Sequence, residues 1–221
     1  MKIYYIRHGE PTYNEHDELT EYGNYQVNEI SKFLSKIPFK LAFTSPILRA
    51  KRSAEPTLNK LGITSKVVDW ASEDFVWFNL NGEWEGNWYW LFIIPSYLEI
   101  FKKYYDKTNE DFYEDPEIQK TNFKMIKTTI DKGIDEWFET LGFVHDRKNK
   151  KYIAKNVKEK EVILFAHQGV STFIFSSLLD ECYPKYILDH PHLIDCASIN
   201  IFNIDEKTGK ISLEVYNDIK Y

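Results

Sequence analysis

Residues 2–10 read KIYYIRHGE, and this stretch indicates the fold class. Residues 2–6 are apolar and rich in side chains that favour β-structure, which predicts a short buried strand. Arg7 and His8 follow where that strand ends. In open α/β sheets the functional residues gather at the carboxyl ends of the strands. The stretch therefore predicts a β-sheet with a functional site at the carboxyl end of this strand.

Further along the chain, segments with strand and helix patterns alternate. Thr20 is the expected N-cap of a first helix, Pro46 is expected in the first turn of a second, and Gly62 is expected to close that second helix. Strands that alternate with helices predict an α/β fold, here a three-layer sandwich whose mostly parallel central sheet is covered on both faces. The expected strands are residues 2–6, 41–44, 65–69, 161–166, 197–204 and 211–216, and the expected helices are residues 20–36, 46–61 and 169–179.

The middle of the chain breaks this alternation. Residues 70–115 hold five of the six tryptophans, and an acidic stretch and a long helical pattern from about Pro116 to Leu141 follow. We interpret residues 70–145 as an aromatic, helical insertion or lid over one edge of the sheet, within a single domain spanning residues 1–221. Core packing is the favoured explanation for most of the aromatic side chains, and a solvated face for the acidic run.

Composition excludes several classes of protein. The 221 residues include 28 Lys and Arg against 34 Asp and Glu, and a net charge of −6 argues against nucleic-acid or anionic-membrane partners. No apolar run reaches the roughly 18 residues of a membrane-spanning helix. Two cysteines are too few for a disulfide framework, and the first strand leaves no room for a secretory leader, so we expect a cytoplasmic protein. The sequence does not reveal the oligomeric state.

Arginine is scarce in this chain. Only four of the 28 cations are arginines, and three of those lie in the first quarter: Arg7, Arg49 and Arg52. The planar guanidinium forms paired hydrogen bonds to phosphate that lysine cannot reproduce. Arg52 lies one helical turn beyond Arg49, so it either faces the same pocket or pairs with Glu55 on the surface, and the surface pair is favoured.

The segment Ile6-Arg7-His8-Gly9-Glu10, with Asn14 further on, resembles the N-terminal motif of the histidine phosphatase superfamily, which includes the cofactor-dependent phosphoglycerate mutases. Further segments resemble that family's motifs in the same order, and together they cover about residues 2–90 and 160–204. They are LTEYG at 19–23, TSPILRA at 44–50, GEWEG at 82–86 and FAHQG at 165–169.

The resemblance implies a phosphate site, and the residue types suit one. Histidine is a nucleophile that can carry a phosphoryl group, and phosphoryl transfer depends mainly on positioning and electrostatic stabilisation. We expect His8 to be the nucleophile, Arg7 and Arg49 to grip the phosphoryl group, and His167 to act as a further catalytic, phosphate-binding donor. Asn14 matches the family position that touches the phosphate. Gly9 would let the backbone approach it.

The proton donor is less evident. The family places a glutamate four residues before the first glycine of the GEWEG segment, but Phe78 stands there. The preceding Glu73 is our choice for acid and then base, with Glu83 and Glu85 as alternatives. A second departure is Gln168, which stands where the family has glycine and is expected to alter the wall of the pocket.

The expected function is that of a metal-independent, histidine acid-type phosphatase that hydrolyses a small phosphorylated metabolite through a phosphohistidine intermediate, without a cofactor. Two alternatives remain open: a phosphoglycerate or phosphosugar mutase, and a non-catalytic module that binds a phosphorylated ligand. The loop between Asn14 and Leu19 lacks the usual mutase residues. Residues 189–196 contain two histidines, two aspartates and a cysteine, but Pro191 separates the histidines and no second cluster matches, so no metal is expected.

Overall fold

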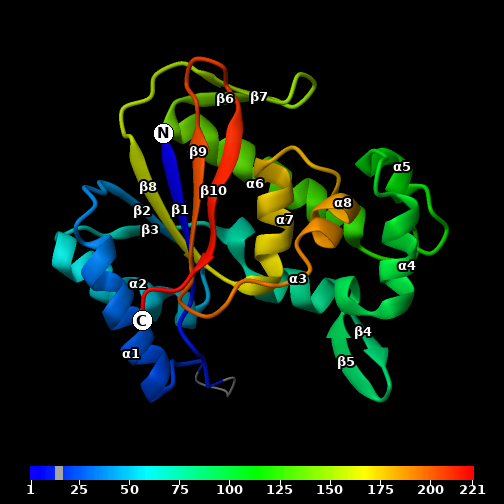
Figure 1. Cartoon of the computed structure of the whole chain (residues 1–221), viewed down its shortest axis with the longest axis horizontal. Coiled ribbons are helices and arrows are strands. Elements are labelled where there is room, and N and C mark those ends of the chain that lie inside the picture. The colour runs from blue at the N-terminus through cyan, green and yellow to red at the C-terminus, as the bar shows by residue number, and fades with distance from the viewer. Residues whose placement is uncertain (13–16) are drawn as a thin grey trace.

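The computed structural model describes residues 1–12 and 17–221, so the predicted phosphate ligand Asn14 lies outside the described residues. Six strands form one sheet in the order β10-β9-β1-β8-β2-β3 (Figure 1). Strands β1, β8, β2 and β3 are parallel to one another, whereas β9 runs antiparallel to β1 and β10. The sheet is therefore mostly parallel, as expected. Its strands are β1 (Lys2–Arg7), β2 (Leu41–Thr44), β3 (Ser65–Val67), β8 (Glu161–Ala166), β9 (Ile199–Ile204) and β10 (Ile211–Asp218).

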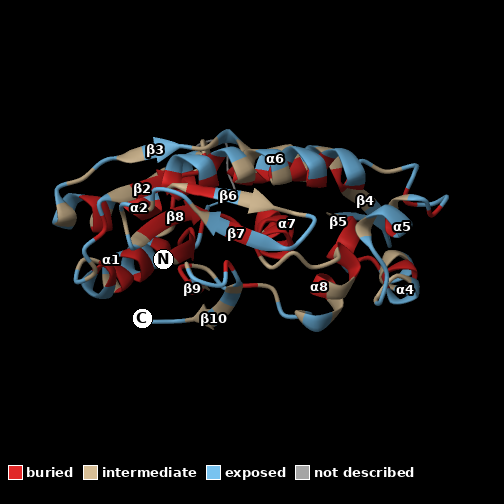
Figure 2. Cartoon of the chain, turned by 90° about the horizontal axis from the view of Figure 1, so that it is seen from above, coloured by how far each residue is buried: buried red, intermediate tan, exposed pale blue. Residues whose placement is uncertain are grey.

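Helices cover both faces of the sheet. Alternate side chains of β1 point to opposite faces, so Tyr4 and Ile6 join one apolar core while Ile3 and Tyr5 join the other. The first core is completed by α1 (Glu21–Leu34) and α2 (Leu48–Leu61), and the second by α6 (Phe123–Leu141), α7 (Gln168–Leu178) and α8 (Tyr183–Asp189). Figure 2 shows buried residues on the strands and on the helix faces turned toward them. The three-layer α/β prediction is confirmed.

Two helix ends follow the sequence signals. Oγ1 of Thr20 accepts the N–H of Gly23 at 2.9 Å, which satisfies a donor in the first turn of α1. Gly62 ends α2 in the left-handed conformation with φ of 67°.

The start of α2 was predicted wrongly. The helix begins at Leu48, so Pro46 lies outside it. The reason is that Ile47 has extended backbone, with ψ of 139°, and that Oγ of Ser45 accepts the N–H of Ile47 at 3.3 Å. Ser45 thus forms a turn of its own before the helix.

Several other boundaries also differ, such as the end of the first helix, which was expected at residue 36 and lies at Leu34. The helix expected from Pro116 starts at Phe123, because Oδ1 of Asp115 accepts a backbone N–H two residues on and forms a local turn. The strand expected to reach residue 69 ends at residue 67, where a 3₁₀ turn follows. The strand expected from Ala197 begins two residues later, because Ala197 has a φ of 54°.

The segment between β3 and β8 forms smaller elements to one side of the sheet. Figure 1 shows the β4–β5 hairpin, α4 and α5 beyond α7 and α8. Phe101 and Phe112 are fully buried, as core packing predicts, whereas Phe78 and Trp88 are 75% and 63% exposed. These elements are η1 (Asp69–Ala71), α3 (Glu73–Asn79), β4 (Asn81–Trp84), β5 (Asn87–Trp90), η2 (Leu91–Ile93), α4 (Pro95–Lys103), α5 (Asn109–Tyr113), β6 (Phe143–Asp146) and β7 (Lys151–Ala154).

His145 of β6 ties the β6–β7 hairpin to the helices. Its Nδ1 lies 2.9 Å from Oδ1 of Asp135 in α6, and its Nε2 lies 2.9 Å from Oδ2 of Asp180, which follows α7. The ring also stacks on Tyr152 of β7. Burial lowers the pKa of His145, but the hydrogen bonds to Asp135 and Asp180 outweigh burial and raise the pKa above 6.5. No helix in the described part of the chain has the length and apolar character to cross a bilayer.

Candidate active site

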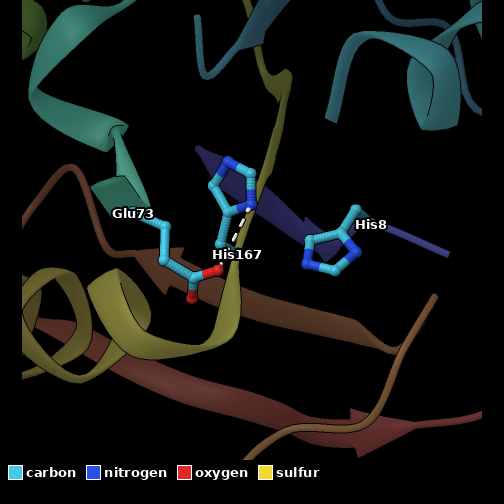
Figure 3. Close-up of side chains that lie close together, drawn as sticks. All are labelled: His8, Glu73 and His167. Carbon is cyan, nitrogen blue, oxygen red and sulfur yellow. Dashed lines mark ion pairs between the residues drawn. The ribbon is translucent and has the colours of Figure 1, made fainter. Parts of the chain in front are cut away.

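The register of the parallel strands brings the two predicted histidines together. Arg7, the last residue of β1, pairs with Ala166, the last residue of β8, so His8 and His167 leave the sheet side by side. Their ring centroids lie 5.0 Å apart. Ser45 leaves β2 at the same edge, and its N–H donates to the carbonyl of Phe165 at 2.9 Å. The site therefore lies where sheet topology predicts it (Figure 3).

His8 is buried and oriented as a nucleophile. Its Nδ1 lies 2.7 Å from the carbonyl oxygen of Gly9, and because a carbonyl can only accept, Nδ1 carries the proton. Nε2 therefore has the free electron pair, and Nε of Arg49 donates to it at 3.3 Å. Burial, and then the positive charges of Arg7 and Arg49, hold the pKa of His8 well below its usual value. The imidazole is thus neutral near pH 7.

His167 is held on two sides. Its Nε2 lies 2.7 Å from Oγ of Ser45, and its carbonyl oxygen accepts the hydroxyl of Tyr5 at 2.6 Å. Oγ of Ser45 accepts the N–H of Ile47 and can donate its own proton to Nε2, and in that tautomer the proton of the neutral imidazole is on Nδ1. Nδ1 is buried with no hydrogen-bond partner among the described residues. Burial, then the neighbouring His8 and the positive charges of Arg49 and Arg7, holds the pKa of His167 well below its usual value.

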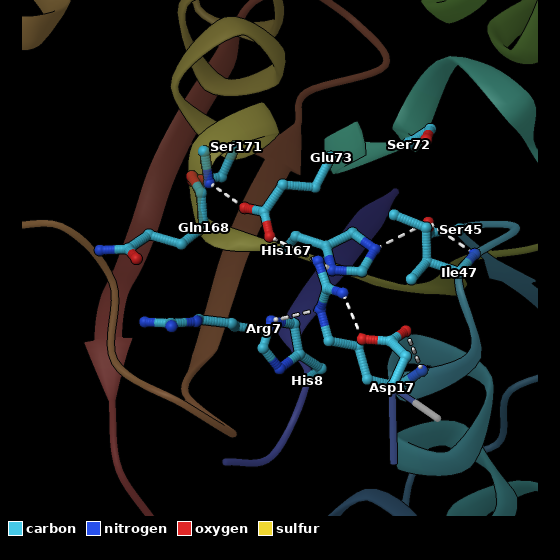
Figure 4. Close-up of polar contacts among 12 residues, drawn as sticks. Arg7, His8, Asp17, Ser45, Ile47, Ser72, Glu73, His167, Gln168 and Ser171 are labelled. Atoms are coloured by element: carbon cyan, nitrogen blue, oxygen red, sulfur yellow. Dashed lines mark hydrogen bonds and ion pairs between the residues drawn. The ribbon is translucent and has the colours of Figure 1, made fainter. Parts of the chain in front are cut away.

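The two predicted arginines lie near the histidines, and Figure 4 shows Arg7 next to His8. Arg49 has a side chain only 8% exposed, and its guanidinium donates to Oδ1 of Asp17 at 2.5 Å and to Oε2 of Glu73 at 2.7 Å. Arg7 donates from NH1 to the carbonyl of Ile194 at 2.6 Å. Its Nε is buried and has no hydrogen-bond partner within the described residues. Both arginines therefore have fixed positions beside His8.

Glu73 is the one of the three candidate proton donors that the structure brings to the histidines. It is the first residue of α3 and is buried, and its Oε1 accepts the N–H of Gly169 at the start of α7 at 2.6 Å. Its Oε2 lies 3.8 Å from Nδ1 of His167. The alternatives Glu83 and Glu85 are exposed on the β4–β5 hairpin.

His8, Glu73 and His167 together also have the donor types of a zinc site. One candidate ligand atom from each lies within 4.8 Å of the others. Arg49, however, donates hydrogen bonds to both His8 and Glu73, and Arg7 adds a second positive charge. A dication would have to replace or repel these guanidinium groups. The three donors fit a metal in residue type, but the two guanidinium groups beside them disfavour a dication and suit an anion instead.

The 189–196 segment does not bring its possible metal ligands together. Oδ2 of Asp189 binds Lys185. Nδ1 of His190 lies 3.0 Å from the carbonyl oxygen of Tyr186, and the His190 ring stacks on the ring of Tyr186. Among the residues that the structure describes, the only three possible metal ligands that lie close together are His8, Glu73 and His167.

Other predicted residues have definite places. Arg52 forms the expected surface pair with Glu55 at 3.0 Å and a further pair with Glu18 at 3.1 Å. Gly9 has a packing role that the sequence did not suggest: a Cβ there would lie 2.6 Å from the carbonyl oxygen of Gly23. The glycine thus permits the close approach of α1.

Sequence reasoning missed three residues that support the site: Tyr5, Asp17 and Ser45. Ser45 lies in a quoted motif, and the alignment of the β2 and β8 ends is a signal that could have identified it. Side chains alternate between the two faces of β1, and this pattern could have placed the Tyr5 hydroxyl near the end of the neighbouring strand β8. Nothing in the sequence points to the pairing of Asp17 with Arg49.

The fold and the paired histidines at adjacent strand ends define a histidine-phosphatase-like protein. Residues 3–88 match the family model of the histidine phosphatase superfamily (branch 1). The resemblance to this superfamily is therefore confirmed in sequence over that segment, and the structural matches extend it to the fold of the whole chain. No curated protein matches the sequence.

Solved structures match along nearly the full chain. A mycobacterial glucosyl-3-phosphoglycerate phosphatase is 16% identical, with 98% of both chains covered and a TM-score of 0.63. The α-ribazole phosphatase of Shigella flexneri is 18% identical, covering 99% of this chain and 96% of its own, with a TM-score of 0.62. A phosphoserine phosphatase of Entamoeba histolytica, in complex with 3-phosphoglyceric acid, is 20% identical, with coverage of 99% and 98% and a TM-score of 0.61.

Proposed function

We propose that the chain is a metal-independent hydrolase of small phosphate monoesters that works through a phosphohistidine at His8. The observation that carries the proposal is a neutral, buried histidine whose free Nε2 faces Arg49 beside two buried donors without partners among the described residues, Nε of Arg7 and Nδ1 of His167. Unsatisfied buried polar atoms are rare, and a catalytic role is one of the explanations for them. The phosphatase names of the three structural neighbours support the same reaction class.

In the first step, Nε2 of His8 attacks phosphorus and the bond from phosphorus to the leaving oxygen breaks. The electron pair moves to that oxygen, which takes a proton from Glu73. Arg7, Arg49 and Nδ1–H of His167 donate hydrogen bonds to the phosphoryl oxygens and stabilise the charge that they carry.

In the second step, water attacks phosphorus and the bond between Nε2 and phosphorus breaks. The electron pair returns to Nε2 of His8, and the Glu73 carboxylate takes the proton of the water. Inorganic phosphate leaves, and the starting protonation states are restored. The hydrogen bond from Nδ1 of His8 to Gly9 keeps Nε2 as the reacting nitrogen in both steps.

The test is hydrolysis of p-nitrophenyl phosphate in the presence of a chelator, with wild type and His8→Ala compared. We expect chelator-resistant turnover by the wild type, an acid-labile phosphoryl label on the protein, and neither in His8→Ala. Chelator-resistant turnover that survives in His8→Ala would overturn the proposal. Turnover that needs a bisphosphorylated primer and yields an isomer would identify a mutase, and tight phosphate binding without turnover would identify a binding module.

A metal-dependent hydrolase is the second candidate, because His8, Glu73 and His167 offer two nitrogens and a carboxylate within reach of one ion. The same assay separates the two candidates. Activity that the chelator abolishes and a divalent metal restores would favour the metal-dependent reaction, and unchanged activity favours the phosphohistidine route.

A further inference from the structure

A pocket of about 390 Å³ opens beside the catalytic residues. It lies between α3, the end of β5 and the start of α7, and is lined by Arg49, Glu73, Asp74, Trp77, Trp90 and Gln168. Arg49 and Glu73 belong to both the pocket and the proposed phosphate site. A phosphate ester held at Arg49, with its leaving oxygen at Glu73, therefore has its leaving group in this pocket.

Two indole rings form the apolar wall of the pocket. Trp77 lies four residues after Glu73 on α3, so both side chains point to the same face of that helix. The ring of Trp77 meets the ring of Trp90 edge to face, with centroids 4.7 Å apart. Trp90 packs closely over Gly169, where a Cβ would lie 2.5 Å from the indole, and stacks on Phe92. The wall is thus braced from behind and is half-exposed to the pocket.

The charges around the pocket are unfavourable to a second anion. Among its lining residues that the structure describes, Arg49 is the one cation, and it is already assigned to the phosphoryl group. The exposed Asp74 adds a carboxylate at the rim next to Glu73, and Gln168 is uncharged. A carboxylate or second phosphate on the leaving group would face Asp74 with no cation to bind it.

Resting on the proposed hydrolysis, we propose that this pocket selects monoesters whose leaving group has a flat, ring-shaped apolar face and carries no further anionic group. The ring lies against Trp77 and Trp90, as aromatic side chains commonly bind rings. Asp74 and Gln168 accept hydrogen bonds from hydroxyl groups at the edge of the ring and, in the case of Asp74, repel anions. Phosphoglycerates and sugar bisphosphates are therefore poor substrates.

The test uses three alkyl phosphates whose leaving alcohols need the same proton: benzyl phosphate, glycerol 3-phosphate and 3-phosphoglycerate. We expect kcat/KM to fall about tenfold from the benzyl ester to the glycerol ester, through lost ring contacts, and about tenfold again for the phosphoglycerate, through repulsion by Asp74. Trp77→Leu lowers the preference for benzyl over glycerol, whereas Asp74→Lys raises the ratio of phosphoglycerate to benzyl turnover by about tenfold. Trp88→Leu, a change in an exposed tryptophan of the hairpin, leaves both ratios unchanged and is the matched control.

The inference would be overturned if kcat/KM were equal for the three esters, or if neither Trp77→Leu nor Asp74→Lys changed the ratios. Either result would leave the proposed His8-dependent hydrolysis intact. If no ester is hydrolysed, the proposed function fails and the pocket is tested by calorimetry with benzylphosphonate. Binding that Trp77→Leu weakens about tenfold and Trp88→Leu does not would support the pocket. Equal binding by both variants would refute it.

Discussion

Replacing Glu73 by Gln tests the proton donor, because the amide has the same shape but cannot give up a proton in catalysis. The Gln oxygen can still accept the N–H of Gly169, which Glu73 does at 2.6 Å. The amide nitrogen then faces Arg49, and the charged hydrogen bond at 2.7 Å is lost. Such a bond contributes about 1.5–3 kcal/mol, within a typical folding stability of about 5–15 kcal/mol. Arg49 keeps its pairing with Asp17, so we expect a folded variant that melts roughly 4–10 °C lower.

The chemical loss depends on the leaving group. A general acid contributes about 10²–10⁴-fold when the leaving group is an alkoxide, which cannot leave without a proton. p-Nitrophenolate leaves as a stable anion, so its transfer to His8 needs no acid. Single-turnover phosphorylation with enzyme in excess isolates this first step from the later attack of water. In Glu73→Gln we expect the rate for benzyl phosphate to fall about 10²–10⁴-fold and the rate for p-nitrophenyl phosphate to fall less than about tenfold.

Glu83→Gln, a change in an exposed glutamate of the hairpin, is the matched control and should retain both rates. Equal losses for the two esters in Glu73→Gln would refute the assignment of Glu73 as the acid, since loss of geometry alone does not distinguish leaving groups.

Three further predictions concern Arg49 and Ser45 in the site and His145 in the β6–β7 hairpin. Arg49→Gln should lower kcat/KM about 10²–10³-fold, and should move the acid limb of its pH profile upward, because loss of the positive charge raises the pKa of His8 and the neutral form is the active one. Ser45→Ala should lower kcat about 10–100-fold and KM little, because it removes the partner that orients His167. Urea unfolding should show that His145→Gln lowers the free energy of unfolding by about 2–4 kcal/mol at about pH 6 and by less at about pH 9. The reason is that the folded protein raises the pKa of His145. The resulting stabilisation is complete below pH 6.5 and is lost as the pH rises through the folded-state pKa.

Each of these has its own control or contrary result. Arg52→Gln removes a surface arginine and should leave kcat/KM within about twofold, because exposed ion pairs contribute little. An unchanged acid limb in Arg49→Gln would show that Arg49 does not set the pKa of His8. A Ser45→Ala effect confined to KM would contradict a positioning role. A cost of His145→Gln that is the same at both pH values would show that the imidazole is uncharged in the clamp with Asp135 and Asp180.

The sheet and most of the site were predictable because both depend on local, periodic signals. The apolar runs at residues 2–6 and 161–166 identify the two strands that position His8 and His167. The starts of α2 at Leu48 and of α6 at Phe123 were not predictable. In each case a side chain ahead of the helix, Ser45 or Asp115, accepts a nearby backbone N–H and forms a non-helical turn.

Long-range pairing limited the prediction of the site. Glu73 was one of three possible acids in the sequence, and only the packing of α3 against α7 brings its carboxylate to Gly169. The pairing of Asp17 with Arg49 joins a loop residue to the first turn of α2 and has no local pattern.

The pairing of β1 with β8 makes the site depend on a contact between distant parts of the chain. The Tyr5 hydroxyl and His167 are 162 positions apart, so their contact closes a loop of most of the chain, and such non-local closure slows folding. The segment that matches the family model holds His8, Arg49 and Glu73 but not His167. A phosphate analogue that needs both histidines therefore binds only the completed sheet, and it should raise the melting temperature of the entire domain by mass action. Binding of such an analogue and folding of the sheet are thus thermodynamically linked in this molecule.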